Sequence, residues 1–248
     1  PFLGLNRVQT RLLMMIALYA MLGMGLNVLT GYTGLVSLGH AGFYGIGAYT
    51  TAVLLTYTGL NFWLSIFVGM LMSMLLAIPL AAASLRVKGQ FLVVITYAFC
   101  EIFRYIAINV PVLGGTGGMA GLKAPEVFGV RITKLAATNK GGYMILLFLL
   151  VSVAAFFSWR VQRSRVGYAF AAIREDEIAA EAMGINLAKH KMLSFCTSAF
   201  FAGVSGALFA MFVTNAQAKV YTTTMTYEIL LIVVIGGIGS IPGSVIAS

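Results

Sequence analysis

Long apolar runs, separated by short polar or glycine-rich breaks, make up most of this chain. A helix needs about 20 apolar residues to cross the hydrocarbon core of a membrane. We therefore expect membrane-spanning helices at residues 11–29, 62–85, 91–110, 143–159, 192–213 and 227–247. The pattern predicts an all-α integral membrane protein, a polytopic bundle of about 6–8 transmembrane helices that forms a single domain over residues 1–248.

The segment from Gly31 to Tyr57 is too rich in glycine for an ordinary straight span. It reads GYTGLVSLGHAGFYGIGAYTTAVLLTY. Small residues permit either tight packing between helices or a broken helix that lines a cavity, and both roles stay open. We expect a broken or re-entrant segment here. A second glycine-rich stretch, GGIGSIPG at 236–243, interrupts the last apolar run and weakly echoes the first.

A charged stretch between apolar runs extends from Gly167 to Lys191. It holds four of the seven acidic residues of the chain, and six cations lie between Arg160 and Lys191. Charge of this density must lie in water, and an excess of cations is typical of the cytoplasmic side of a membrane. Arg86 and Lys88 indicate the same side. Residues 160–191 are therefore expected to form a cytoplasmic loop, and the polar residues 112–142 an external one.

A short helix is predicted inside this cytoplasmic loop. Asp176 is suited to accept the free N–H groups of its first turn, and Gly184 to occupy the left-handed position that ends it. A helix this short is not stable alone in water, so it either docks on another protein or folds back on its own domain. The expected docking residues are Asp176, Glu177, Ile178, Ala179, Glu181, Ala182, Met183 and Gly184.

Composition supports the membrane assignment. The chain is 60% hydrophobic and 9% charged, with a mean hydropathy of +0.96, whereas soluble domains carry about 25% charged residues. The net charge of +9 lies in short clusters between apolar runs, which disfavours a nucleic-acid partner. Cys100 and Cys196 both lie in apolar segments and are interpreted as packing residues, with no disulfide framework or metal site.

The sequence offers little enzymatic chemistry. It has no Gly-x-x-x-x-Gly-Lys-Ser/Thr string for binding nucleotide phosphates, and no plausible catalytic group. Glu101 and Arg104 lie on one face of a predicted span, either as a structural ion pair or with Glu101 contacting substrate. His40 is either a proton relay or substrate contact, or a histidine satisfied by packing. The candidate pathway residues are Ser37, His40, Tyr44, Tyr97 and Glu101.

The charged loop also carries a family resemblance. The string AIREDEIAAEAMGI at 172–185 resembles the coupling loop of the LivH/LivM family of ABC importer permeases, especially the LivM type. Five further strings are similar in the family's order, over most of the chain from about residue 26. They are GYTGLVSLGHAGFYGIGAY, LRVKGQFLVVITYAFCEIFR, LGGTGGMAGL, SFCTSAFFAGVSGALFA and VVIGGIGSIPGS.

The resemblance implies a multi-pass permease subunit in the bacterial inner membrane that moves branched-chain amino acids inward. Its implied partners are a second, LivH-like permease subunit, two cytoplasmic ATPases that bind ATP and Mg, and a periplasmic or lipid-anchored binding protein. ATP binding in those partners would act on the coupling helix, so this chain would be neither an enzyme nor a cofactor carrier. Family members continue past the GGIGS string, so we expect the 248 residues to be truncated at one or both ends.

Two alternatives stay open. Importers of the same architecture move urea or short amides, and the sequence does not distinguish these substrates. An ion-coupled secondary transporter or channel would need ionisable groups at membrane depth. Glu101, Arg104 and His40 are its only support, and it leaves the charged loop unexplained.

Overall fold

A computed structural model describes residues 7–84, 90–122, 126–127, 130–131 and 141–248. The long helices are α1 (Arg7–Leu26), α2 (His40–Val53), α3 (Phe62–Ser84), α4 (Gln90–Asn109), α6 (Gly141–Gln162), α7 (Arg165–Glu175), α9 (Leu187–Val213) and α10 (Thr223–Ile235). Short helical pieces are η1 (Asn27–Tyr32), η2 (Leu54–Thr58), η3 (Pro111–Leu113), η4 (Gly115–Gly117), α8 (Glu177–Ala182) and α11 (Ile241–Ile246). Four two-residue strands complete the described elements: β1 (Met119–Ala120), β2 (Glu126–Val127), β3 (Val130–Arg131) and β4 (Asn215–Ala216).

The membrane-spanning character of the helices is confirmed. Within the described residues, four helices are long and apolar enough to cross a membrane: Val8–Tyr32, Phe62–Ala83, Phe91–Asn109 and Leu187–Val213. Two shorter apolar helices cover Leu147–Gln162 and Thr223–Ile235. The protein is an all-α polytopic bundle, as the hydropathy pattern predicts. Arg86 and Lys88, and residues 123–125, 128–129 and 132–140 of the expected external loop, lie outside the described residues.

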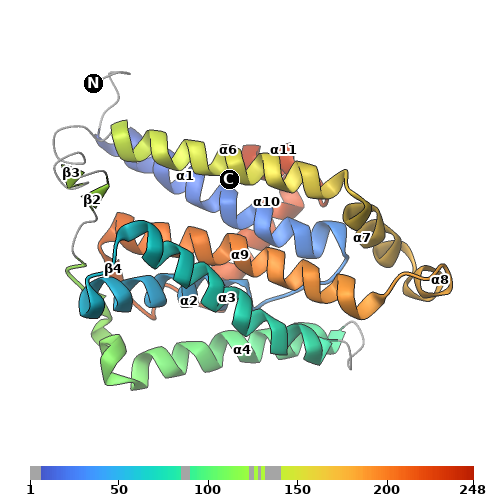
Figure 1. Cartoon of the computed structure of the whole chain (residues 1–248), viewed down its shortest axis with the longest axis horizontal. Coiled ribbons are helices and arrows are strands. Elements are labelled where there is room, and N and C mark those ends of the chain that lie inside the picture. The colour runs from blue at the N-terminus through green and yellow to red at the C-terminus, as the bar shows by residue number, and fades with distance from the viewer. Residues whose placement is uncertain (1–6, 85–89, 123–125, 128–129, 132–140) are drawn as a thin grey trace.

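The helices lie roughly parallel or antiparallel along the long axis of the molecule (Figure 1). Helix α9 runs through the middle and packs against α1, α2 and α3, while α6 covers α1 and α4 covers α2. Helices α7 and α8 lie at one end of the bundle. The start of α1 and the pair β1–β4 lie at the opposite end (Figure 1). We call the end of the bundle that holds α7 and α8 the polar pole.

Glycines allow α9 to approach its neighbours closely. A methyl group on Gly47 of α2 would overlap the carbonyl oxygen of Gly203 of α9, and one on Gly206 would overlap the carbonyl oxygen of Tyr44. A methyl group on Gly203 would also come within 2.7 Å of Ser73 Oγ in α3. Small residues that bring backbones together are the usual basis of helix association in membranes. The glycines of α2 therefore serve tight packing.

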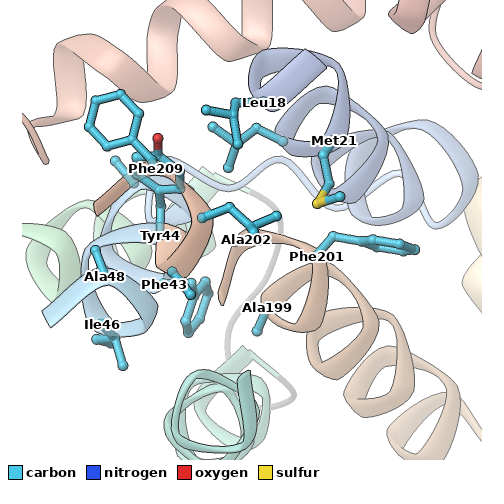
Figure 2. Close-up of a cluster of buried hydrophobic side chains, with 14 of the residues drawn as sticks. Leu18, Met21, Phe43, Tyr44, Ile46, Ala48, Ala199, Phe201, Ala202 and Phe209 are labelled. Carbon is cyan, nitrogen blue, oxygen red and sulfur yellow. The ribbon is translucent and has the colours of Figure 1, made fainter. Parts of the chain in front are cut away.

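Buried side chains from α1, α2 and α9 meet in the space that these helices enclose (Figure 2). Leu18 and Met21 come from α1, Tyr44 from α2 and Ala202 from α9, and all four are at most 2% exposed. Hydrogen bonds reinforce the contact, because Ser205 Oγ donates to the Leu18 carbonyl oxygen at 3.0 Å. Such bonds between helices add to packing where no water competes.

The glycine-rich segment is broken and runs from one end of the bundle to the other. It starts at Gly31, beside α7, continues without helix through residues 33–39 and enters α2 at His40. It continues through α2 to the end of the bundle that holds β4, away from α7 (Figure 1). Near its last residue, the Tyr57 hydroxyl donates to the Val112 carbonyl oxygen at 3.3 Å. The structure thus describes two helical parts, η1 and α2, with a non-helical stretch between them.

The second glycine-rich stretch is also a break. Helix α10 ends at Ile235, and α11 starts at Ile241 after Ser240 caps it by accepting from Gly243 N–H. Gly237 and Gly239 between them have φ values of +94° and +87°. Residues with a side chain rarely adopt this conformation, which explains the glycines here.

Candidate functional site

The charged loop folds into a pair of short helices, α7 and α8. Ser164 caps the start of α7 by accepting from Gly167 N–H at 3.3 Å. The inner face of α7 carries Phe170 and Ile173, which are 0% and 2% exposed. The Phe170 ring meets the His190 ring edge-on at 6.2 Å, next to the start of α9. Packing of this face holds α7 against the bundle and leaves its charged face in water.

Both ends of α8 carry the predicted capping residues. Asp176 Oδ1 accepts from Ile178 N–H at 2.8 Å and from Ala179 N–H at 3.1 Å. Gly184 has a φ of +84°, and its N–H donates to Glu181 O at 2.9 Å. Ile185 N–H reaches back to Ala180 O at 3.0 Å, which completes a Schellman motif. The caps satisfy backbone groups that a helix this short would otherwise expose.

The outward side of α8 presents apolar side chains to solvent. Ile178 is 82% exposed and Met183 is 83% exposed. Ala179, Ala182 and Glu181 are exposed as well, whereas Ala180 is buried against the protein. The helix therefore buries one side against the protein and exposes an apolar surface with acidic neighbours on the other. We call Ile178, Ala179, Ala182 and Met183 the apolar face of α8.

An ion pair holds α8 to the long helix α9. Glu177 Oε1 and Lys191 Nζ are 2.7 Å apart, and the Lys191 side chain is only 10% exposed. A lysine is rarely buried unless its charge is paired. Lys191 thus fixes the start of α8 on the first turns of α9.

A second cationic contact joins α7 to the first membrane helix. Arg174 Nη1 donates to the carbonyl oxygen of Gly31 at 2.6 Å. Gly31 is the last residue but one of the helical run of α1 and η1, which ends at Tyr32 before the non-helical residues 33–39. The helix pair α7–α8 is therefore connected to α1 through Arg174 and to α9 through Lys191.

The five candidate pathway residues do not form one cluster. Ser37 and His40 are both 1% exposed, and Ser37 Oγ accepts from Gly39 N–H at 3.2 Å. His40 lies between Leu22 O, 3.1 Å from Nε2, and Ser198 Oγ, 3.3 Å from Nδ1. Tyr44 is fully buried against the Phe209 and Tyr221 rings. Tyr97 is 44% exposed on α4, so it faces away from the packed interior.

Glu101 and Arg104 form the expected ion pair. Arg104 Nη2 lies 2.7 Å and Nε 2.8 Å from Glu101 Oε2. Glu101 Oε1 accepts from Thr223 Oγ1 at 3.3 Å, which joins α4 to the start of α10. The two side chains are thus paired in the structure, and the structural role of the pair stays a prediction. No group of three His, Cys, Asp or Glu side chains suited to a metal occurs among the described residues.

Sequence reasoning missed three polar residues of this region. Arg174 was not distinguished from the other cations of the loop, and Lys191 was not paired with Glu177. Asn27 was overlooked, although an asparagine within an apolar run indicates a specific partner. Its side chain bonds Gly239 N, Ser240 O and Ser244 Oγ at 2.8 to 2.9 Å.

Fold and loop together define a class: a polytopic helical membrane protein with a capped, partly apolar helix exposed at one pole. Comparison with known proteins identifies the family. Residues 9–248 match the family described as branched-chain amino acid transport system / permease component. The chain belongs to this family.

Two relatives are permease proteins LivM of high-affinity branched-chain amino acid transport systems. The one from Salmonella typhimurium is 35% identical, and the match covers 97% of this chain and 61% of the relative. The one from Escherichia coli is 36% identical, with 90% and 57% covered. The permease protein LivH of Salmonella typhimurium is 26% identical over 92% of this chain and 77% of its own length. This chain thus spans about 60% of the length of the LivM relatives. No solved structure matches.

Proposed function

We propose that this chain is a membrane-spanning subunit of an ABC importer that moves branched-chain amino acids inward. It is a transport subunit, not an enzyme. ATP and Mg bind to partner ATPases, two of which dock at the polar pole of the assembly. A second, LivH-like permease subunit and a periplasmic or lipid-anchored binding protein complete the assembly in the bacterial inner membrane.

The observation that carries this proposal is the apolar face of α8. Ile178 and Met183 are more than 80% exposed although α8 is capped at both ends and pinned to α9. A rigid, short helix with exposed apolar anchors suits a groove on a partner protein. Acidic Glu181 beside these anchors supplies charge that steers a basic partner surface. The membership in a permease family supplies the identity of that partner as an ATPase.

Two further observations favour the importer over an ion-coupled transporter. Glu101 is neutralised by Arg104, so it offers no free charge at membrane depth. His40 is fully enclosed by Leu22 O and Ser198 within the bundle. The substrate assignment rests on the names of the relatives, which are branched-chain amino acid permeases. An importer of the same architecture for urea or short amides is the alternative to be tested by competition.

The docking claim is tested by changing the apolar face while preserving the Glu177–Lys191 ion pair. In the double variant I178D/M183D, both anchors become charged, and we expect co-purification of the ATPase subunits to fall by at least about tenfold. Because both side chains are solvent-exposed, the membrane domain should keep its thermal stability. Tight association of the ATPases with this variant would refute the docking surface.

The matched control is Val112→Asp. Val112 is 53% exposed and belongs to η3, at the pole opposite α8. It receives the same aliphatic-to-carboxylate change without touching the apolar face. We expect this variant to co-purify with the ATPases as the parent chain does.

A further inference from the structure

Arg174 reaches from α7 into the broken end of the first membrane helix. Its Nη1 donates to Gly31 O at 2.6 Å, and its aliphatic stem lies on Gly34, where a methyl group would come within 3.0 Å of Arg174 Cγ. Gly34 itself has a φ of +74°, so a side chain there would be strained by the backbone conformation and would crowd the stem of Arg174. The chain is shaped at this point to receive Arg174.

The contact adds a hydrogen-bond donor at a helix end. Carbonyl groups at the end of a helix lack partners within it and need others. Here Val28 O accepts from Thr33 Oγ1 and Leu29 O from Leu35 N, each at 3.2 Å. Both of these donors belong to the same segment. The donor to Gly31 O, Arg174, comes instead from the helix pair at the polar pole, and it brings a positive charge to the negative end of the helix.

The second glycine-rich break meets the first at this place. Asn27 Oδ1 accepts from Gly239 N–H at 2.8 Å, and Asn27 Nδ2 donates to Ser240 O at 2.9 Å. A methyl group on Gly31 would come within 2.7 Å of Gly239 N. Gln162, at the end of α6, adds a donor to Gly239 O at 3.3 Å. The two glycine-rich stretches that echo each other in sequence therefore form one junction beneath α7.

The far end of the non-helical segment is fixed separately. Leu38 N–H donates to Thr96 Oγ1 of α4 at 3.0 Å, and a methyl group on Gly39 would come within 2.7 Å of Thr96 O. His40 then opens α2 between Leu22 O and Ser198. Residues 33–39 are thus held at both ends but carry no helix of their own. Segments of this kind can absorb large changes in backbone torsion angles at low cost.

We propose that Arg174 is the positioning residue that links the docked helix pair to the broken membrane helix. Motion of α7 and α8 is passed through this contact to Gly31 and to the break at residues 236–240. Residues 33–39 then change their backbone conformation, because one end moves with this junction while the other stays bonded to Thr96 of α4. This inference rests on the proposed function, since the docked ATPases supply the motion.

The test follows a cysteine on the non-helical segment. Val36 is 40% exposed, so Val36→Cys, in a chain with Cys100 and Cys196 replaced by alanine, reports the position of this segment through its rate of maleimide labelling. The full chain is assembled with its partner permease and ATPases, with and without a non-hydrolysable ATP analogue. We expect nucleotide to change the labelling rate by roughly tenfold. No response to nucleotide in this parent chain would overturn the proposal.

Arg174→Gln is then measured against Arg165→Gln, which removes the same charge at the exposed first residue of the same helix. We expect Arg174→Gln to keep its ATPases but to reduce the nucleotide response to less than about twofold, whereas Arg165→Gln keeps the full response. Arg174→Lys retains a charged donor of shorter reach and should respond to an intermediate extent. A purely structural role predicts loss of assembly in both Arg174 variants, and that outcome, or a full response in Arg174→Gln, overturns the proposal. If the docking surface is wrong, the I178D/M183D variant will still co-purify with the ATPases. That result is independent of the labelling experiment.

Discussion

At the scale of single residues, Asp176 organises the exposed helix α8. One carboxylate oxygen accepts from two N–H groups, at 2.8 and 3.1 Å, in a helix of six residues. In so short a helix, the cap satisfies a large share of the backbone groups that have no helical partner. The orientation of the apolar face therefore depends on this side chain.

Asp176→Ala is expected to loosen α8 without unfolding the bundle. The loss of an N-cap costs about 1 kcal/mol, and here the cost falls on a local element. Hydrogen exchange of the amides of residues 178–183 should rise several-fold, while the amides of α9 stay protected. Asp176→Ser, which keeps an acceptor oxygen, is the control and should stay close to the parent. Equal exchange in the alanine and serine variants would contradict the capping role.

Glu101 tests the choice between an importer and an ion-coupled transporter. Because Arg104 and Thr223 hold its carboxylate, Glu101→Gln removes an ion pair but leaves a hydrogen-bonding side chain in place. We expect the free energy of unfolding to fall by about 1 kcal/mol, with ATP-driven uptake and its ion dependence unchanged. Uptake that loses a dependence on Na⁺ or H⁺ in this variant would favour ion coupling.

These residue-level features are also the ones that sequence could predict. The Asp176 cap, the Gly184 terminus and the pairing of Glu101 with Arg104 all depend on neighbours within a few positions along one helix. The Arg174–Gly31 contact joins residues 143 positions apart, and the Asn27–Gly239 contact joins residues 212 apart. No local pattern specifies such pairs, because they depend on how whole helices are arranged.

At the scale of elements, the centre of the bundle is built on contact between backbones. Gly47 on α2 and Gly203 on α9 bring these helices together, and Ser73 of α3 donates to Phe43 O at 3.1 Å. On α9 the small residues Ala199, Gly203 and Ala207 lie at i,i+4 spacing, which is typical of a helix-packing face. The partner glycines on α2 were predicted only as one of two alternatives, because a glycine run in a span does not reveal whether a helix or a cavity lies against it.

Gly47→Ala is expected to destabilise the bundle strongly. The added methyl group would overlap the Gly203 carbonyl oxygen, a backbone atom that can move only with the whole of α9. Overpacking a close contact costs about 1–3 kcal/mol or more. Thermal unfolding of the purified chain in detergent, followed by tryptophan fluorescence, measures the effect.

Gly117→Ala is the control for that experiment. Gly117 lies in η4 with open space around it, so a methyl group there meets nothing. We expect its unfolding temperature to match the parent. If both alanine variants unfold at the same temperature as the parent, the two backbones of α2 and α9 do not lie in close contact at Gly47.

At the scale of the whole molecule, the fold separates two poles. The helix pair α7–α8 and the junction of both glycine breaks lie at one pole, and β1–β4 lies at the other (Figure 1). Between the poles, the broken segment 31–57 runs alongside α9, which begins at the pole of α7 and α8. The arrangement places the exposed helix pair next to the broken membrane helix, through the Arg174–Gly31 contact, as the proposed drive by a partner requires.

Uptake by the complete assembly tests the proposed ATP-driven import. The complete assembly is reconstituted in proteoliposomes, and uptake of radiolabelled leucine is followed with and without ATP on the side of the ATPases. We predict uptake that requires both ATP and the ATPase subunits, competes with isoleucine and valine but not urea, and is lost in I178D/M183D. Leucine uptake that continues without ATP and without the ATPase subunits would contradict the proposed import mechanism.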